Sequence, residues 1–195
     1  MKKLNLNFRN NERPKRGSIL ISDPLLNDQY FSRSVVLLCE HNQEGSFGFV
    51  LNNYLEIDLH RIDNNFPDIQ ARISIGGPVH RENLFFIHSF DAGVIPESVQ
   101  VAEGIFYGGD FDILATLLRD FPETRNKARF FVGYSGWSIG QLNEEIVEKS
   151  WITVSNIPKD LIFDTQNDNL WKTCLEMQGD SFKLFTTFPR NPQDN

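Results

Sequence analysis

The most constraining stretch of this chain is residues 128–155, ARFFVGYSGWSIGQLNEEIVEKSWITVS, which predicts a strand, a tight turn, a helix and a second strand. The apolar run at residues 129–132 is typical of a buried strand. Gly133 and Gly136 predict a sharp turn after it, because glycine adopts positive φ without steric cost. We expect the rest of the chain to be arranged around this unit.

The start of the expected helix follows from the residues after the turn. Ser138 suits the N-cap position and Gln141 falls at N3, which makes a capping box. Trp137 and Leu142 then occupy the two positions of a hydrophobic staple. The expected apolar stripe is Ile139, Leu142 and Ile146, and the glutamates expected to turn away from it are Glu144, Glu145 and Glu148.

The glycine-rich turn matches two functional motifs in part. A phosphate-binding loop needs GxGxxG or GxxxxGK[ST] spacing, and this segment has neither. A nucleophile elbow centred on Ser135 needs GxSxG, whereas the second glycine here, Gly136, directly follows the serine. The spacing therefore favours a structural turn that lets Trp137 dock against the helix.

Turn and helix signals divide the rest of the chain into short strands and a few helices. Strands are expected at residues 18–21, 34–39, 47–51, 72–75, 84–88 and 99–106, and a short helix near residues 58–61. Asp110 is a candidate N-cap for one longer helix, and Asp168 for another that runs to Met177.

Length and composition favour a single domain in a reducing compartment. The 195 residues can bury one core without disulfides, and the two cysteines form no CxxC pair. No apolar run approaches the length of a membrane span, and residues 1–16 lack the apolar segment of a secretory signal. We therefore expect a cytoplasmic protein with one globular domain at residues 17–195.

Charge is distributed unevenly along the chain. Six basic residues and one acidic residue give residues 1–16 a net charge of +5, so residues 17–195 carry −12 and the whole chain −7. A body this acidic repels phosphate backbones, whereas a basic tail attracts them. We expect the tail to be a mobile, solvated terminus. We expect neither direct sequence-specific DNA binding nor membrane association.

Three segments together resemble one family of bacterial proteins. They are GSILISDPLLNDQYFSRSVVLLCEHNQEGSFGFVLN from Gly17, IGGPV from Ile75, and GYSGWSIGQLNEEI from Gly133 with the following Trp151. In this order and spacing they resemble the YqgE/AlgH family, over residues 17–155. Ser138 and Ile139 stand where that family commonly has glycine and proline, which strengthens the capping-box interpretation.

The resemblance implies an α+β fold, in which a mixed β-sheet curls into a barrel-like core with helices packed outside. It implies a cytoplasmic bacterial protein and no particular reaction, because the family is largely uncharacterised. One branch of the family gave its name to a proposed transcriptional regulator of alginate synthesis. The sequence has no helix-turn-helix signature that would support direct action on DNA.

Two side chains close in the sequence are candidates for chemistry. Cys39 and His41 share a face of an expected strand, and could form a nucleophile with its base or half of a zinc site with His80 or His88. The apolar run that Cys39 ends favours a buried cysteine instead. The four histidines follow no ligand spacing, so we expect no metal and no cofactor.

One further segment suits the wall of a ligand cleft. Gly76-Gly77-Pro78 leaves backbone N–H groups free near a strand end, although a sharp chain reversal needs the same residues. The candidate ligand-cleft residues are Gly76, Gly77, Gly133, Ser135, Gly136 and Trp137.

Three hypotheses about function follow. The first is a non-enzymatic binding or regulatory module with a protein or small-molecule partner. The second is a hydrolase that uses Ser135 or the Cys39–His41 pair, and the third is a nucleic-acid binder that uses the basic tail. We favour the first, because every catalytic motif fails a spacing test and the body is acidic.

Overall fold

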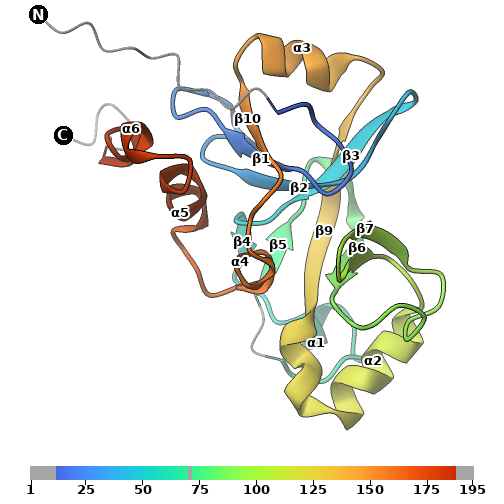
Figure 1. Ribbon diagram of the computed structural model, residues 1–195. Coiled ribbons are helices and arrows are strands. Elements are labelled where there is room, and N and C mark those ends of the chain that lie inside the picture. The colour runs from blue at the N-terminus through green and yellow to red at the C-terminus, as the bar shows by residue number, and fades with distance from the viewer. Residues whose placement is uncertain (1–11, 70–71, 188–195) are drawn as a thin grey trace, which may run out of the picture.

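The strand β9 (Ala128–Trp137) lies at the centre of a ten-stranded sheet. The computed structural model describes residues 12–69 and 72–187 of the chain (Figure 1). The other strands are β1 (Ile19–Ser22), β2 (Val35–Asn42), β3 (Gly45–Val50), β4 (Tyr54–Leu55), β5 (Ile73–Ile75), β6 (Val79–His88), β7 (Val99–Ala102), β8 (Ile105–Tyr107) and β10 (Trp151–Val154). The helices are α1 (Leu59–Ile62), α2 (Phe111–Asp120), α3 (Gln141–Val147), α4 (Lys159–Phe163), α5 (Leu170–Glu176) and α6 (Asp180–Lys183), with 3₁₀ helices η1 (Pro122–Lys127) and η2 (Phe185–Thr187).

The sheet is mixed and open. Its strands follow the order β10-β1-β2-β3-β9-β6-β8-β7, and β4 joins through β5, which pairs with β9. Neighbours along this order are antiparallel, whereas β5 runs parallel to β9 with Ser74 opposite Phe131. The α+β class is confirmed, although the strand order ends at β10 and β7, so the sheet does not close into a barrel.

Apolar clusters cover both faces of the sheet. Ile19 and Ile21 of β1 belong to one cluster and Leu20 between them to another, as alternating strand side chains require. The first cluster includes the buried residues of α5, and the second includes Leu142 of α3. A third cluster joins β5, β6 and β9 to α2. Figure 1 shows α3 above the sheet and α2 below it, with α5 to one side.

The turn predicted at residues 133–136 is wrong, because β9 continues through it to Trp137. Gly133 has a φ of 69°, and a β-carbon there would lie 2.8 Å from the carbonyl oxygens of Gly77 and Val79. The glycine therefore allows two backbones to approach closely within the sheet. The chain turns further on, before α3, where Gly140 has a φ of 79°.

The start of α3 matches the predicted capping box only in part. The helix begins at Gln141 with Gly140 as its N-cap, so Ser138 lies before the cap. The Gln141 side-chain oxygen still accepts a hydrogen bond from the Ser138 backbone N–H at 3.0 Å. Leu142 is buried as predicted, but Ile139 is 74% exposed and lies outside the buried stripe, because it precedes the helix.

Glu145 was expected to face solvent, and it faces inward. Its Oε2 accepts hydrogen bonds from the indole N–H groups of Trp137 at 2.9 Å and Trp151 at 2.7 Å. Its Oε1 accepts a third, at 3.0 Å, from the Gln141 side chain. The Glu145 carboxylate thus links α3 to the end of β9 and the start of β10 by hydrogen bonds. These three elements form the unit at residues 128–155 around which the rest of the chain was expected to be arranged.

The two predicted aspartate caps have different outcomes. The Asp110 carboxylate accepts hydrogen bonds from two backbone N–H groups in the first turn of α2, at 2.9 and 3.0 Å, which confirms the N-cap. Asp168 does not cap α5, where Asn169 occupies the N-cap position. The Asp168 carboxylate instead accepts a hydrogen bond from the Arg72 guanidinium at 2.6 Å.

Residues 1–11 of the predicted basic tail lie outside the described residues. The remaining part, residues 12–16, contacts the domain through Arg16 and Glu12. The Arg16 guanidinium lies 3.5 Å from the Glu40 carboxylate, and the Ser155 hydroxyl donates a hydrogen bond to Glu12 at 2.6 Å. Within residues 12–69 and 72–187, no helix has the length and apolar character needed to cross a membrane.

Candidate functional site

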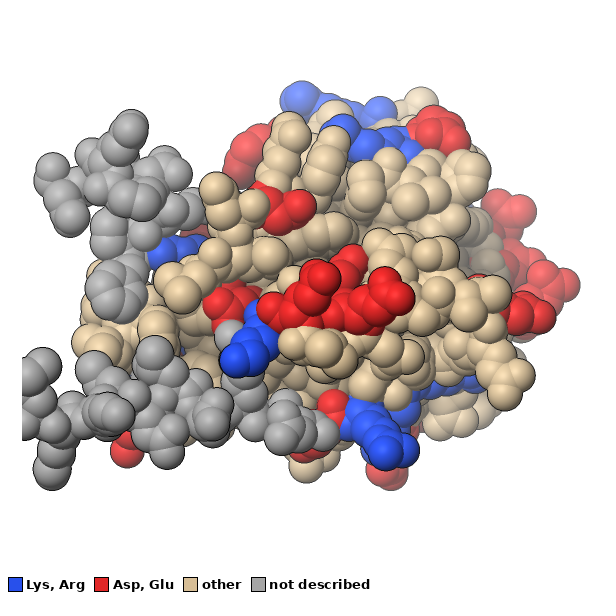
Figure 2. Space-filling view, turned by 90° about the horizontal axis from the view of Figure 1, so that it is seen from above, with Lys and Arg blue, Asp and Glu red and all other residues tan. Residues whose placement is uncertain are grey.

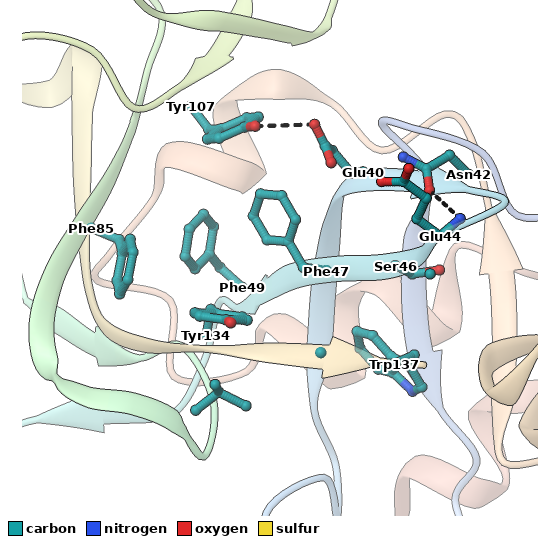
Figure 3. A pocket seen from close by; sticks show the side chains of 13 residues that line it. Glu40, Asn42, Glu44, Ser46, Phe47, Phe49, Phe85, Tyr107, Tyr134 and Trp137 are labelled. Atoms are coloured by element: carbon teal, nitrogen blue, oxygen red, sulfur yellow. Dashed lines mark hydrogen bonds between the residues drawn. The ribbon is translucent and has the colours of Figure 1, made fainter. Parts of the chain in front are cut away.

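A cavity of about 650 Å³ opens between the β2–β3 hairpin and the strands β6, β8 and β9 (Figure 3). Its wall carries the rings of Phe47, Phe49, Phe85, Tyr107 and Tyr134. The other lining residues are Glu40, Asn42, Glu44, Gly45, Ser46, Val79, Gly136 and Trp137, whose ring packs with Leu142 and Trp151 on the other face of the sheet. Its volume falls within the range of about 300–1,000 Å³ that is usual for small-molecule sites.

Phe47 is the central ring of the wall. Its centroid lies 6.0 Å from Phe49, 5.1 Å from Tyr107 and 5.8 Å from Tyr134, at interplanar angles of 82°, 83° and 74°. These are edge-to-face arrangements, which aromatic pairs favour. Phe47 and Phe49 share a face of β3 because they are two residues apart. The rings therefore hold one another in place without a ligand.

The floor of the cavity is continuous with the protein core. Phe49 is buried and stacks on Phe131 of β9 at 4.6 Å with an interplanar angle of 11°. Phe85 of β6 lies 5.8 Å from Phe49 and 5.7 Å from Tyr134. The rings of the wall therefore stand on four hydrogen-bonded strands, β3, β6, β8 and β9, which makes the wall a rigid surface.

Glu40 places a carboxylate at the rim. The Tyr107 hydroxyl donates a hydrogen bond to its Oε1 at 3.2 Å, and the Arg16 guanidinium lies 3.5 Å from the same oxygen. Burial, followed by the charge and hydrogen bond of Glu40, raises the pKa of Tyr107 to about 12. Tyr107 is therefore protonated at neutral pH and acts as a donor to Glu40.

The tip of the β2–β3 hairpin forms the outer rim. The Asn42 side-chain oxygen accepts a hydrogen bond from the Glu44 backbone N–H at 2.8 Å, and His41 Nδ1 lies 2.7 Å from the Ser46 hydroxyl. Asn42 and Glu44 are exposed. Among the described residues that line the cavity there is no lysine or arginine, so its fixed charges are the two glutamates.

Two of the six predicted cleft residues, Gly136 and Trp137, line this cavity. The other four, Gly76, Gly77, Gly133 and Ser135, are buried outside its wall. The Ser135 hydroxyl donates a hydrogen bond to the Gly76 carbonyl at 2.9 Å, and a β-carbon on Gly76 would lie 2.3 Å from the Gly133 carbonyl oxygen. The backbones of the two glycine segments thus contact each other directly, and glycine is required because a side chain would not fit between them.

The groups of the hydrolase hypothesis lie apart from one another. Cys39 is fully buried at a register shift of β2, and burial together with the charge of Glu40 raises the pKa of its thiol well above the ordinary value. His41 contacts Ser46 instead. In the described part of the chain, no hydrogen bond joins Cys39 or Ser135 to a histidine.

The four histidines also lie in separate environments. His60 Nδ1 is 2.9 Å from a backbone carbonyl, and His80 Nδ1 is 3.1 Å from the Glu82 carboxylate. His88 is buried and stacks on Phe106. Across residues 12–69 and 72–187, no group of three or more His, Cys, Asp and Glu side chains is arranged to hold a metal ion.

No motif in the sequence marks most of the aromatic wall as a site. The alternation of Phe47 and Phe49 along one strand is a local signal for a shared face. Tyr107 and Tyr134 reach the same volume because β8 pairs with β6, and β6 and β3 both pair with β9. These pairings join segments far apart in the chain, which the spacing of residues does not reveal.

The AlgH-like family model matches residues 19–183. The chain belongs to the AlgH-like family. A UPF0301 protein from Parabacteroides distasonis is 40% identical over 183 residues, which cover 93% of this chain and 92% of the relative. A UPF0301 protein from Cytophaga hutchinsonii is 36% identical over 180 residues, covering 92% and 98%. The resemblance seen in the sequence is confirmed and extends beyond residue 155.

Solved structures show the same fold at lower identity. Protein DIP2367 from Corynebacterium diphtheriae has a TM-score of 0.75 at 21% identity, covering 91% of this chain and 94% of its own. The solution structure of the AlgH protein from Pseudomonas aeruginosa has a TM-score of 0.70 at 24% identity, covering 89% and 94%. The fold of this AlgH-like chain is therefore shared over nearly its whole length.

Proposed function

We propose that this AlgH-like protein is a non-enzymatic binding module whose ligand occupies the aromatic cavity. The observation that carries the proposal is the convergence of rings from β3, β6, β8 and β9 on one open volume. Except for Phe49, the rings of the wall are partly exposed to water, and removing apolar surface from water is favourable. A ligand with an apolar body covers these rings, so the free energy of its binding has a clear source.

The polar groups at the rim suit the same role. Ligand sites combine apolar walls with a small number of placed polar groups that fix the orientation of the ligand. Here Tyr107 and Glu40 are already joined by a hydrogen bond, and Tyr134 and Ser46 lie on the same wall. Because the rings hold one another in place, binding costs little ordering of the protein.

Any effect on transcription then runs through the bound ligand or another cytoplasmic protein. Residues 17–195 carry a charge of −12, and Figure 2 shows acidic side chains gathered near the middle of the face seen from above. Such a surface repels DNA. We expect duplex affinity no better than about 10⁻⁴ M at physiological salt, the weak end of non-specific binding. Sub-micromolar, sequence-selective binding in a fluorescence anisotropy titration would contradict this expectation.

Gly136 offers a direct way to close the cavity. It lines the wall, is exposed, and a β-carbon there would meet only the Tyr134 ring, at 3.4 Å. Gly136→Leu therefore places an apolar side chain against the cavity wall without a backbone clash. Asn143→Leu, on the exposed surface of α3, adds a leucine elsewhere and is the matched control.

The probe is N-phenyl-1-naphthylamine, a neutral aromatic fluorophore that brightens in apolar sites. We expect saturable binding to the wild type and to Asn143→Leu, and affinity at least about tenfold weaker, equivalent to about 1.4 kcal/mol, for Gly136→Leu. Circular dichroism checks that both variants fold. Equal binding by Gly136→Leu and wild type, or no saturable binding by the wild type, would overturn the proposed function.

A further inference from the structure

The charged groups of the cavity wall are both acidic. Glu40 uses Oε1 for its contacts with Tyr107 and Arg16, and within the described residues its Oε2 has no hydrogen bond or ion pair. The Glu44 carboxylate, on the exposed hairpin tip, likewise has none in the described part of the chain. Apolar walls focus the field of such charges. A ligand in the cavity therefore meets a negative potential at the rim.

The charge balance leaves this potential partly uncompensated. Arg16 forms an ion pair with Glu40, and the Arg16 side chain is 46% exposed while the Glu40 side chain is 32% exposed. If Arg16 neutralises Glu40, the charge of Glu44 remains. The contact also shows that Glu40 at the rim pairs with a cationic group of this same chain.

The ring geometry favours the same kind of ligand. Cations bind the faces of aromatic rings within about 6 Å of the centroid. Phe47 is inclined to Tyr107 and Tyr134 by 83° and 74°, so these rings form a corner in which a small group contacts more than one of them. Figure 3 shows Tyr107 directed toward Glu40, with Phe47 between Tyr107 and Tyr134.

The same combination of ring and cation occurs elsewhere in this protein. The Arg72 guanidinium carbon lies 3.7 Å above the centroid of the Tyr54 ring. Its Nη1 also donates to Asp168, so ring and carboxylate hold one cation together. The cavity offers the ring and the carboxylate, and it lacks a cation among the residues that line it.

We propose that the cavity binds a small organic cation, an amine or quaternary ammonium attached to an apolar body. The apolar body packs on Phe49 and Phe85, and the cationic group lies at the rim between the Tyr107 ring and the carboxylates of Glu40 and Glu44. This inference rests on the proposed binding function and adds the charge of the ligand to it.

Three indoles of similar size and different charge separate the two proposals. Tryptamine is a cation at pH 7, tryptophol is neutral and indole-3-acetate is an anion. In isothermal titration calorimetry with the full chain, we expect tryptamine to bind at least about tenfold more tightly than tryptophol, a difference of about 1.4 kcal/mol. Indole-3-acetate should bind most weakly, and the preference for tryptamine should fall as salt screens the rim charges.

The double variant Glu40→Gln with Glu44→Gln tests whether the two rim carboxylates cause the preference for tryptamine over tryptophol. Glutamine still accepts the Tyr107 hydrogen bond, so we expect tryptophol affinity to stay within about twofold and the tryptamine preference to disappear. Glu123→Gln, an exposed change on η1 at the opposite end of β9, should keep the wild-type preference. This control removes the same kind of charge far from the cavity.

The remaining outcomes of these titrations contradict the cation inference alone or both proposals. Tryptophol or indole-3-acetate binding as tightly as tryptamine would sink the cation inference and leave the binding function intact. A tryptamine preference that survives in the double variant would also overturn it, as would binding of N-phenyl-1-naphthylamine without binding of any indole. No binding of any of the four probes would overturn both proposals.

Discussion

His88 is a buried titratable side chain that the cavity does not use. It has no exposed surface, and neither ring nitrogen has a hydrogen-bond partner among the described residues. Its ring stacks on Phe106 at 5.2 Å with an interplanar angle of 10°. Burial lowers its pKa from 6.5 to about 4, because the charged ring would lose its hydration. His88 is therefore neutral at pH 7 and behaves as an aromatic core residue.

This burial makes stability depend on pH with a defined sign. Below pH 6.5 the unfolded chain binds a proton at His88 that the folded chain refuses until about pH 4, so stability falls as pH falls through this window. Between pH 7 and pH 5 the loss from this group is about 2 kcal/mol, at 1.36 kcal/mol per pKa unit. Urea unfolding at the two pH values measures it.

His88→Phe is the control for the pH effect. A phenylalanine keeps the stacking on Phe106 and cannot be protonated, so its loss of stability between pH 7 and pH 5 should be about 2 kcal/mol smaller than that of the wild type. Equal losses in the two proteins would show that His88 does not titrate in this way.

Trp137 gives a prediction about packing. It is 4% exposed, belongs to the cluster with Leu142 and Trp151, and donates a hydrogen bond to Glu145. Trp137→Ala should cost about 3–5 kcal/mol, the usual cost of removing a buried aromatic ring. Trp137→Phe keeps the ring and loses the donor, so it should cost less, about 1–3 kcal/mol. Urea unfolding of both variants tests this order, and an alanine variant as stable as the wild type would refute it.

At the scale of elements, β9 depends on glycine where it crosses the β5–β6 connection. Gly133 has a positive φ, and a β-carbon there would also lie too close to the carbonyl oxygens of Gly77 and Val79. Gly140 also has positive φ, but a β-carbon there would have no neighbour within 4 Å. The two positions therefore separate the cost of the φ angle from the cost of the close approach.

Gly133→Ala and Gly140→Ala form a matched pair. Both should lose about 1–2 kcal/mol for a left-handed backbone conformation. Gly133→Ala should lose at least about 1 kcal/mol more, because its methyl group meets two carbonyl oxygens that the sheet holds in place. Thermal unfolding compares them, and equal melting temperatures would show that the contact between the glycine segments can relax freely.

The same elements show what the sequence can predict. The N-cap at Asp110 and the helix predicted to run to Met177 follow from neighbours along the chain, and both are found in the structure, the latter as α5. The glycines at 133 and 136 predict a turn from the sequence, because the close approach of Gly133 to Gly77, 56 residues earlier, is not a local signal. Gly136 and Trp137, two of the predicted cleft residues, line the cavity, whereas most of its rings meet through strand pairing alone.

At the scale of the molecule, two arginines hold the C-terminal region against the sheet. Arg129 is fully buried, and its guanidinium donates hydrogen bonds to the backbone carbonyls of Leu51 and Ile162. Arg72 donates to the Thr165 carbonyl at 2.7 Å, and its guanidinium lies over the Tyr54 ring. Burial lowers the pKa of Arg129, though an arginine stays charged at neutral pH. These partners are mostly backbone atoms, which explains why the sequence did not reveal them.

We propose that this AlgH-like protein binds its ligand in the aromatic cavity, and the position of a bound probe can be measured directly. A ¹H–¹⁵N NMR titration of the full chain with tryptamine locates the bound probe residue by residue. We expect the largest and saturable shift changes at amides of residues that line the cavity, and none of them in Gly136→Leu. These residues include Glu40, Asn42, Gly45, Phe47 and Tyr134. Changes centred on another part of the molecule, or changes that persist in Gly136→Leu, would contradict the account.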